Sequence, residues 1–189
     1  DGDGVTVGNW VSDYDAGSGA ELYAGGFFGT LGITLAGNIA RWNGMSWAPV
    51  GGGTNDTVRS MAVFDDGTGP ALYVGGGFTS ADGLAVPATG IARWNGATWT
   101  PVGGGLNGGV YALHVHDDGS GPALYAGGYF TSEIGGAPAS RIARWNGISW
   151  TQVGSGLNDA VHSLATFDDG SGLKLYAGGF FTATTLGTP

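Results

Sequence analysis

The chain has 189 residues, the size of a single domain, and 41 of them are glycine while 42% are hydrophobic. That apolar content excludes a disordered linker, and seven prolines without a Gly-X-Y period exclude a collagen triple helix. Six basic and fifteen acidic residues give a net charge of −9, which argues against nucleic acid as a partner. The sequence contains no apolar run of ~18 residues, so we expect no insertion into a membrane.

Two strings recur along the chain and define a repeat. Ile-Ala-Arg-Trp-Asn-Gly-x-x-Trp occupies 39–47, 91–99 and 142–150, and Leu-Tyr-x-Gly-Gly occupies 22–26, 72–76, 124–128 and 175–179. Successive tryptophans lie 52 and 51 positions apart, so the chain holds about 3.7 copies of a 51–52-residue unit. The copies span about 1–50, 51–102, 103–153 and an incomplete 154–189.

One copy predicts four short strands. In chain order we expect a strand over Val58–Phe64, a turn over Asp65–Gly69, a strand over Ala71–Val74, a loop over Thr79–Gly90, a strand over Ile91–Trp94, a turn at Asn95-Gly96 and a strand over Trp99–Val102. Asn-Gly favours tight hairpins because both residues tolerate positive φ. Hairpin-length connections indicate an antiparallel sheet.

A four-stranded unit repeating at roughly 50 residues is typical of a β-propeller blade. Such a sheet has two apolar faces and buries both only when it is stacked between neighbours around a shared axis. The sequence therefore predicts an all-β fold, a single β-propeller domain or propeller segment built from four-stranded antiparallel blades. Because the fourth copy lacks its last two strands, we expect either a segment of a longer propeller or a ring closed by other copies of the chain.

The quoted strings, together with Val-Gly-Gly-Gly-Leu-Asn at 102–107, resemble the repeats of secreted bacterial propeller proteins. They are also similar to the propeller of fungal cell-polarity markers, and the double glycine is kelch-like, although the tryptophan spacing departs from the kelch pattern. The resemblance implies an extracellular or cell-surface protein. Since propellers host many activities, it implies the fold more than the function.

Residues present in every copy are expected to serve the blade. The tryptophans are interpreted as packing residues, with repeated sugar-stacking platforms as the alternative, and the arginines as partners of recurring acids, with anion binding as the alternative. This structural set is Trp42, Trp47, Trp94, Trp99, Trp145, Trp150, Arg41, Arg93 and Arg144.

The acidic turns, such as Asp65-Asp66-Gly67 and Asp117-Asp118-Gly119, are interpreted as hairpin turns in which aspartate caps its own turn and glycine takes the positive φ. Calcium at these turns is the alternative, because hard cations take several oxygen ligands, although the turns lack an EF-hand pattern.

The pair His114 and His116 occurs in one copy only, and its spacing on a strand places both on one face. We expect packing histidines, with His116 in place of a core aromatic, and keep a metal or proton-transfer site as the alternative. A metal would need a third ligand. His162, the one other histidine, falls on the opposite face of its strand by register.

No motif for catalysis was found: the chain has no cysteine, no Gly-x-Ser-x-Gly and no phosphate-binding loop, so we expect no enzyme, no catalytic residue and no cofactor. We expect instead a non-enzymatic module that is architectural or binds a protein or its own copies, and keep a carbohydrate-binding propeller as the alternative. The connectors predict a polar recognition rim. Its residues are Asn55, Asp56, Asp82, Asn107, Glu133, Asn158 and Asp159.

Overall fold

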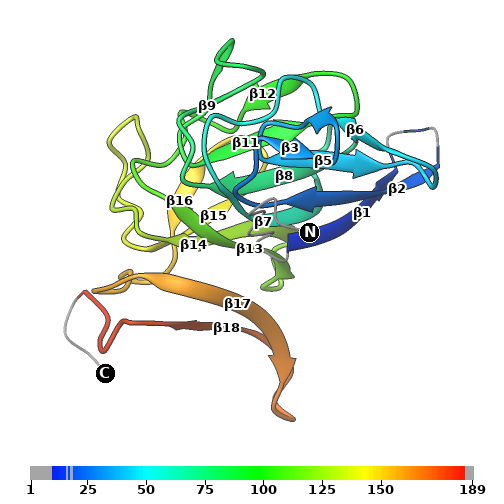
Figure 1. The fold of residues 1–189 in the computed structure, drawn as a ribbon. Helices are drawn as coiled ribbons and strands as arrows, with labels where there is room; N and C mark the ends of the chain where they lie inside the picture. Colours follow the sequence, from blue (N-terminus) through cyan, green and yellow to red (C-terminus); the bar gives the residue numbers. More distant parts are fainter. Residues whose placement is uncertain (1–9, 16, 18, 186–189) are drawn as a thin grey trace.

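The structure is a computed structural model that describes residues 10–15, 17 and 19–185, and every regular element in this part of the chain is a β-strand. Figure 1 shows these strands joined by turns and longer connectors. Among the described residues, no helix is long and apolar enough to span a membrane. The all-β fold class is confirmed.

Three repeats each form a four-stranded antiparallel sheet, as the turn chemistry predicts. The first contains β1 (Trp10–Asp15), β2 (Ala20–Gly25), β5 (Ile39–Trp42) and β6 (Trp47–Pro49). The second contains β7 (Val58–Asp65), β8 (Pro70–Gly76), β11 (Ile91–Trp94) and β12 (Trp99–Pro101). The third contains β13 (Val110–Asp117), β14 (Pro122–Gly128), β15 (Ile142–Trp145) and β16 (Trp150–Gln152). The fourth repeat contributes the pair β17 (Val161–Asp168) and β18 (Leu173–Gly179).

Two connectors contain short hairpins, so the loop expected over Thr79–Gly90 is wrong in this detail. The hairpins pair β3 (Thr30–Leu31) with β4 (Thr34–Leu35), and β9 (Ser80–Ala81) with β10 (Val86–Pro87). Asp82, Gly83 and Leu84 all have positive φ, and this backbone reverses the chain between β9 and β10.

Each inner sheet buries both of its faces. Along β8, Leu72 and Val74 pack with residues of the first sheet, whereas Ala71 and Tyr73 pack with residues of the third. Successive side chains of a strand point to opposite faces, so neighbouring residues serve different sheets. This arrangement explains why the strand is apolar without interruption.

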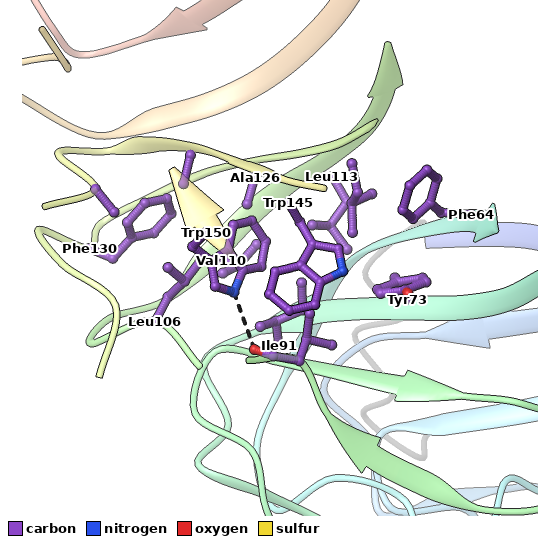
Figure 2. Packing of buried hydrophobic residues seen from close by; sticks show 14 of the residues in the cluster. Phe64, Tyr73, Ile91, Leu106, Val110, Leu113, Ala126, Phe130, Trp145 and Trp150 are labelled. Atoms are coloured by element: carbon purple, nitrogen blue, oxygen red, sulfur yellow. Dashed lines mark hydrogen bonds between the residues drawn. The ribbon is translucent and has the colours of Figure 1, made fainter. Parts of the chain in front are cut away.

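The two faces of a sheet carry different aromatic side chains, and where two four-stranded sheets pack together, a face of one kind contacts a face of the other kind. We call the face with Phe64 and Tyr73 the tyrosine face of the second sheet, and its opposite, with Trp94 and Trp99, the tryptophan face. Figure 2 shows the tyrosine face of the second sheet against the Trp145 side chain and its neighbours in the third sheet. The first and second sheets meet in the same way, with Tyr14 and Tyr23 packed in one cluster with Trp94 and Trp99.

The first strands of the repeats lie beside one another in chain order. β1 contacts β7, β7 contacts β13, and β13 contacts β17. The β17–β18 pair lies at one end of the structure, next to the third sheet (Figure 1).

The double glycine that ends each second strand permits this close approach. A Cβ on Gly75 would lie 2.7 Å from Val110 Cγ1, and one on Gly127 would lie 2.4 Å from Val161 Cγ1. The second glycine meets backbone instead, since a Cβ on Gly76 would lie 2.1 Å from the Thr57 carbonyl oxygen. The repeated pair is therefore explained by contacts at the junction between sheets.

Candidate functional site

Each sheet has two ends of different chemistry. The tight turns after the first and third strands form one end, which we call the turn edge. The connectors between sheets and between second and third strands form the other, the connector edge. Hydrogen bonds tie these two kinds of connector together: the amides of Thr79 and Ser80 donate to Asn55 Oδ1 at 2.9 and 3.0 Å.

The three asparagines of the predicted rim hold the connectors in place. Asn107 and Asn158 accept equivalent pairs of backbone hydrogen bonds in the third and fourth repeats. Each of the three amide nitrogens, including that of Asn55, also donates to a threonine hydroxyl. Their amide groups are thus engaged in the connector itself, a structural role that the sequence reading did not assign.

The acidic residues of the predicted rim also lie on the connector edge. Asp82 Oδ1 accepts the Gly52 amide at 2.8 Å, and Asp56 and Asp159 each accept the amide of the following residue. Glu133 is half-buried and its backbone forms a bridge with the connector before β13. The seven residues share one edge, and these contacts keep each within the connectors of its own repeat.

On the turn edge, the repeated arginines lie beside the acidic turns. Arg93 Nε lies 3.4 Å from Asp66 Oδ2, and the Tyr73 hydroxyl donates to the same oxygen at 2.7 Å. Burial acts to raise the pKa of Asp66, but hydrogen bonds from Thr68 and Tyr73 and the Arg93 charge outweigh it and lower the pKa. In the third repeat, Arg144 Nε lies 3.5 Å from the equivalent carboxylate.

The end repeats reach the same pairing with different residues. The first repeat has Ala16 where the others have the second aspartate, and there Arg41 pairs with Glu21 at 2.7 Å. In the fourth repeat, Lys174 pairs with Asp169 at 3.2 Å. A cation and a carboxylate thus meet in every repeat, whichever strand supplies them.

The turn carboxylates are occupied by their own turns. Asp65 Oδ1 accepts the amides of Gly67 and Gly69, and the equivalent aspartates of the later turns do the same. Within the described ranges, no three His, Cys, Asp or Glu side chains are arranged to hold a metal ion. These contacts favour the hairpin interpretation of the acidic turns over calcium.

The histidine pair lies where the third sheet meets β17. His114 Nε2 and His116 Nδ1 lie 2.8 and 3.0 Å from the same atom, Thr166 Oγ1. The His116 ring meets Tyr125 edge-on at 5.7 Å, as Phe64 meets its own tyrosine one repeat earlier. Burial, followed by the charge of the neighbouring imidazole, lowers the pKa of His114. Both imidazoles thus share one threonine hydroxyl, and the buried His116 ring takes the place of the core aromatic.

His162 belongs to a different group, a row of side chains across three repeats on the connector edge. The Arg59 guanidinium carbon lies 5.1 Å from the Tyr111 ring centroid. Tyr111 and His162 stack with centroids 5.1 Å apart and planes 23° apart, and His162 meets Phe180 edge-on at 4.7 Å. We call these four residues the connector row.

The connector row arises from an irregularity that recurs in the first strands. Pairing shifts between Val58 and Ser60, and at the equivalent places in β13 and β17, so that the intervening residue is left out of the ladder. Such a β-bulge turns a side chain away from the regular alternation. Arg59, Tyr111 and His162 are these residues; the sequence analysis considered His162 only as a potential metal ligand and did not single out Arg59 or Tyr111. The signal was present, since this position differs between copies while the preceding valine recurs.

A second cation–ring pair lies on the same edge. The Arg141 guanidinium carbon lies 4.3 Å from the ring centroid of Tyr129. Arg141 has φ 66°, and the equivalent positions hold Asn38 and Gly90, residues that tolerate this left-handed backbone better. Among the residues that the structure describes, Arg59 and Arg141 are the cationic side chains without an ion-pair partner.

These contacts gather guanidinium and aromatic groups on the connector edge. Arg59, His162 and Phe180 are exposed, so guanidinium and ring groups are presented together to solvent. By contrast, Trp99 and Trp150 are buried and donate their indole N–H to backbone carbonyls at 2.9 and 3.2 Å (the latter in Figure 2), which leaves no open indole face for a sugar. Comparison with protein-family models, with curated proteins and with solved structures finds no match to the chain.

Proposed function

We propose that the chain is a β-propeller segment acting as a non-enzymatic extracellular or cell-surface module, either architectural or protein-binding. The propeller part of the proposal is supported by the ordered contacts of β1, β7, β13 and β17 and by the repeated packing of unlike sheet faces. The resemblance to the repeats of secreted bacterial propeller proteins supports it as well, and suggests the extracellular setting.

The observation that carries the binding role is the connector row. Positions shared by all copies are engaged in packing, ion pairs or connector hydrogen bonds, whereas Arg59, Tyr111 and His162 differ from copy to copy and stack on an exposed edge. Tyrosine and arginine are enriched at the energetic centres of protein interfaces. A protein partner that docks across several repeats is therefore the function we favour.

A protein interaction screen with a triple variant tests this role. Wild type, the variant Arg59→Ala/Tyr111→Ala/His162→Ala and a turn-edge control, Met45→Ala/Ile148→Ala, are compared on one protein array. Met45 and Ile148 are exposed on the opposite edge. We expect saturable binding by wild type and the control, and its loss in the triple variant. Equal binding by all three proteins would contradict the proposal.

Carbohydrate binding is a second candidate function, and exposed phenylalanine and tyrosine rings, rather than the tryptophans, support it. Phe27, Tyr129 and Phe180 occupy the same position in three repeats, directly after the double glycine, and all three rings are exposed. An exposed ring beside polar connectors suits shallow stacking of a sugar. A glycan array distinguishes the candidates: binding that is lost in Phe27→Ala/Tyr129→Ala/Phe180→Ala would favour it, and a blank array would remove it.

A further inference from the structure

The last strand pair leaves its tyrosine face uncovered. Phe167 is 60% exposed and Tyr176 is 42% exposed, whereas Phe64 and Tyr73, at the same positions of the second repeat, are 6% and 0% exposed. The ring pair itself is retained, with centroids 5.9 Å apart against 5.7 Å in the second repeat. The fourth repeat thus exposes, on its two strands, the ring pair of a face that is buried elsewhere in the molecule.

The opposite end of the chain leaves a tryptophan face uncovered. Leu22 of the first sheet is 39% exposed, while its equivalents Leu72 and Leu124 are both 0% exposed. Trp42 and Trp47 are half-buried, whereas the corresponding tryptophans of the second and third sheets are buried. This face is the counterpart that meets a tyrosine face at the two junctions between four-stranded sheets.

The two open faces are therefore the two halves of one interface that the molecule already forms twice. We infer that a second copy of this chain docks its first sheet, through Trp42 and Trp47, onto the tyrosine face of β17–β18. The occupant follows from continuity: the tyrosine faces of the first and second sheets are each covered by the tryptophan face of the next sheet, and a second copy carries an open tryptophan face on its first sheet. The inference rests on the proposed propeller architecture.

Charge does not oppose this docking. Lys174 stands where Ala71 and Ala123 are buried in the inner sheets, so it lies on the face to be covered. Its ammonium group pairs with Asp169 at 3.2 Å in the same strand pair, which leaves the face without a free charge at that point. A long lysine side chain also covers apolar surface with its methylene groups while its charge stays at the rim.

The contact is head-to-tail, because it joins different surfaces of the two copies. Such a contact closes into a ring when the rotation between copies permits, and otherwise grows into longer assemblies. Each copy supplies three four-stranded sheets and the β17–β18 pair, so two copies supply eight sheets or strand pairs. Closed propellers contain about four to eight blades.

Sedimentation of paired variants tests the inference. Phe167→Glu places a charge on the open tyrosine face, Trp47→Glu places one on the open tryptophan face, and Ile148→Glu on the turn edge is the matched control. We expect wild type and the control to sediment above the 18.9 kDa monomer at high protein concentration, and each face variant alone to remain monomeric. Circular dichroism verifies that the variants are folded.

Mixing the two face variants gives the decisive result. The Trp47→Glu chain keeps its tyrosine face and the Phe167→Glu chain keeps its tryptophan face, so head-to-tail docking predicts that the mixture forms a one-to-one complex. A monomeric wild type, or a mixture that stays monomeric while wild type associates, would overturn the inference. A monomer that still binds a partner through the connector row would leave the proposed function standing.

Discussion

Replacing Trp99 by alanine removes a side chain that is only 3% exposed at the junction of the first two sheets. Burial of a tryptophan removes about 150–250 Å² from water, which at about 25 cal/mol per Å² contributes about 4–6 kcal/mol. The alanine keeps part of this, and measured substitutions of buried aromatic residues by alanine cost about 3–5 kcal/mol. We expect a loss of this size in the free energy of unfolding.

A conservative variant separates packing from hydrogen bonding. Trp99→Phe keeps a buried ring but removes the indole donor that lies 2.9 Å from the Val50 carbonyl oxygen, which still accepts the Gly53 amide at 3.0 Å. Loss of this one hydrogen bond costs about 0.5–1.5 kcal/mol, so this variant should lose less stability than Trp99→Ala. Trp47→Ala is the matched control, since Trp47 occupies the same position in the first repeat but is only half-buried.

Urea denaturation followed by far-UV circular dichroism, at concentrations where the chain is monomeric, measures all three variants. The packing argument requires Trp99→Ala to lose the most stability, and both Trp99→Phe and Trp47→Ala to lose less. Equal, small losses for both alanine variants would refute the claim that the sheets bury each other's faces.

Three further outcomes follow from other contacts. Burial, followed by the charge of the neighbouring imidazole, lowers the pKa of His114 below its usual 6.5, so at mildly acidic pH the folded state binds fewer protons than the unfolded state. The free energy of unfolding of wild type, measured by urea denaturation, should therefore fall as the pH is lowered from about 8 to 5, and it should fall less in His114→Ala. Gly127→Ala should lower the midpoint of thermal unfolding because its Cβ would lie 2.4 Å from Val161. Gly178→Ala is the control, since its Cβ would meet only a serine hydroxyl and should lower the midpoint less. Equal midpoints for the two variants would contradict the close packing at the junction between sheets. In a Tyr129→Ala background, where the cation–ring contact is absent, Arg141→Asn relieves a left-handed backbone and should stabilise by about 1 kcal/mol in the same assay, while an unchanged stability would show that the position carries no strain.

The repeat and its strands could be predicted because their causes are local. Asn-Gly turns, short apolar runs and the fixed spacing of Trp94 and Trp99 all act within one copy, and they indicate a four-stranded sheet without knowledge of its neighbours. The hairpin formed by β9 and β10 was missed, since its pairing depends on positive φ at Asp82 and Leu84, for which neither residue type is a reliable marker.

The candidate site could be predicted only in its location. The strand order places the connectors on one edge, and the rim residues do lie there. The role of Asn55 was not foreseen, because an asparagine that accepts backbone amides looks in sequence like one that faces a ligand. The row of Arg59, Tyr111 and His162 depends on three bulges in three repeats, and stacking between strands that are about fifty residues apart leaves no local pattern.

Contacts of the indole N–H protons test the central claim, that unlike faces of consecutive sheets pack together, most directly. Nuclear Overhauser spectra of the labelled chain should connect the Trp99 indole proton with Val50 and the Trp150 indole proton with Val102, because these pairs join different sheets. Both indole protons should also exchange slowly with solvent. Rapid exchange, with cross-peaks only to residues of the same sheet, would contradict the account.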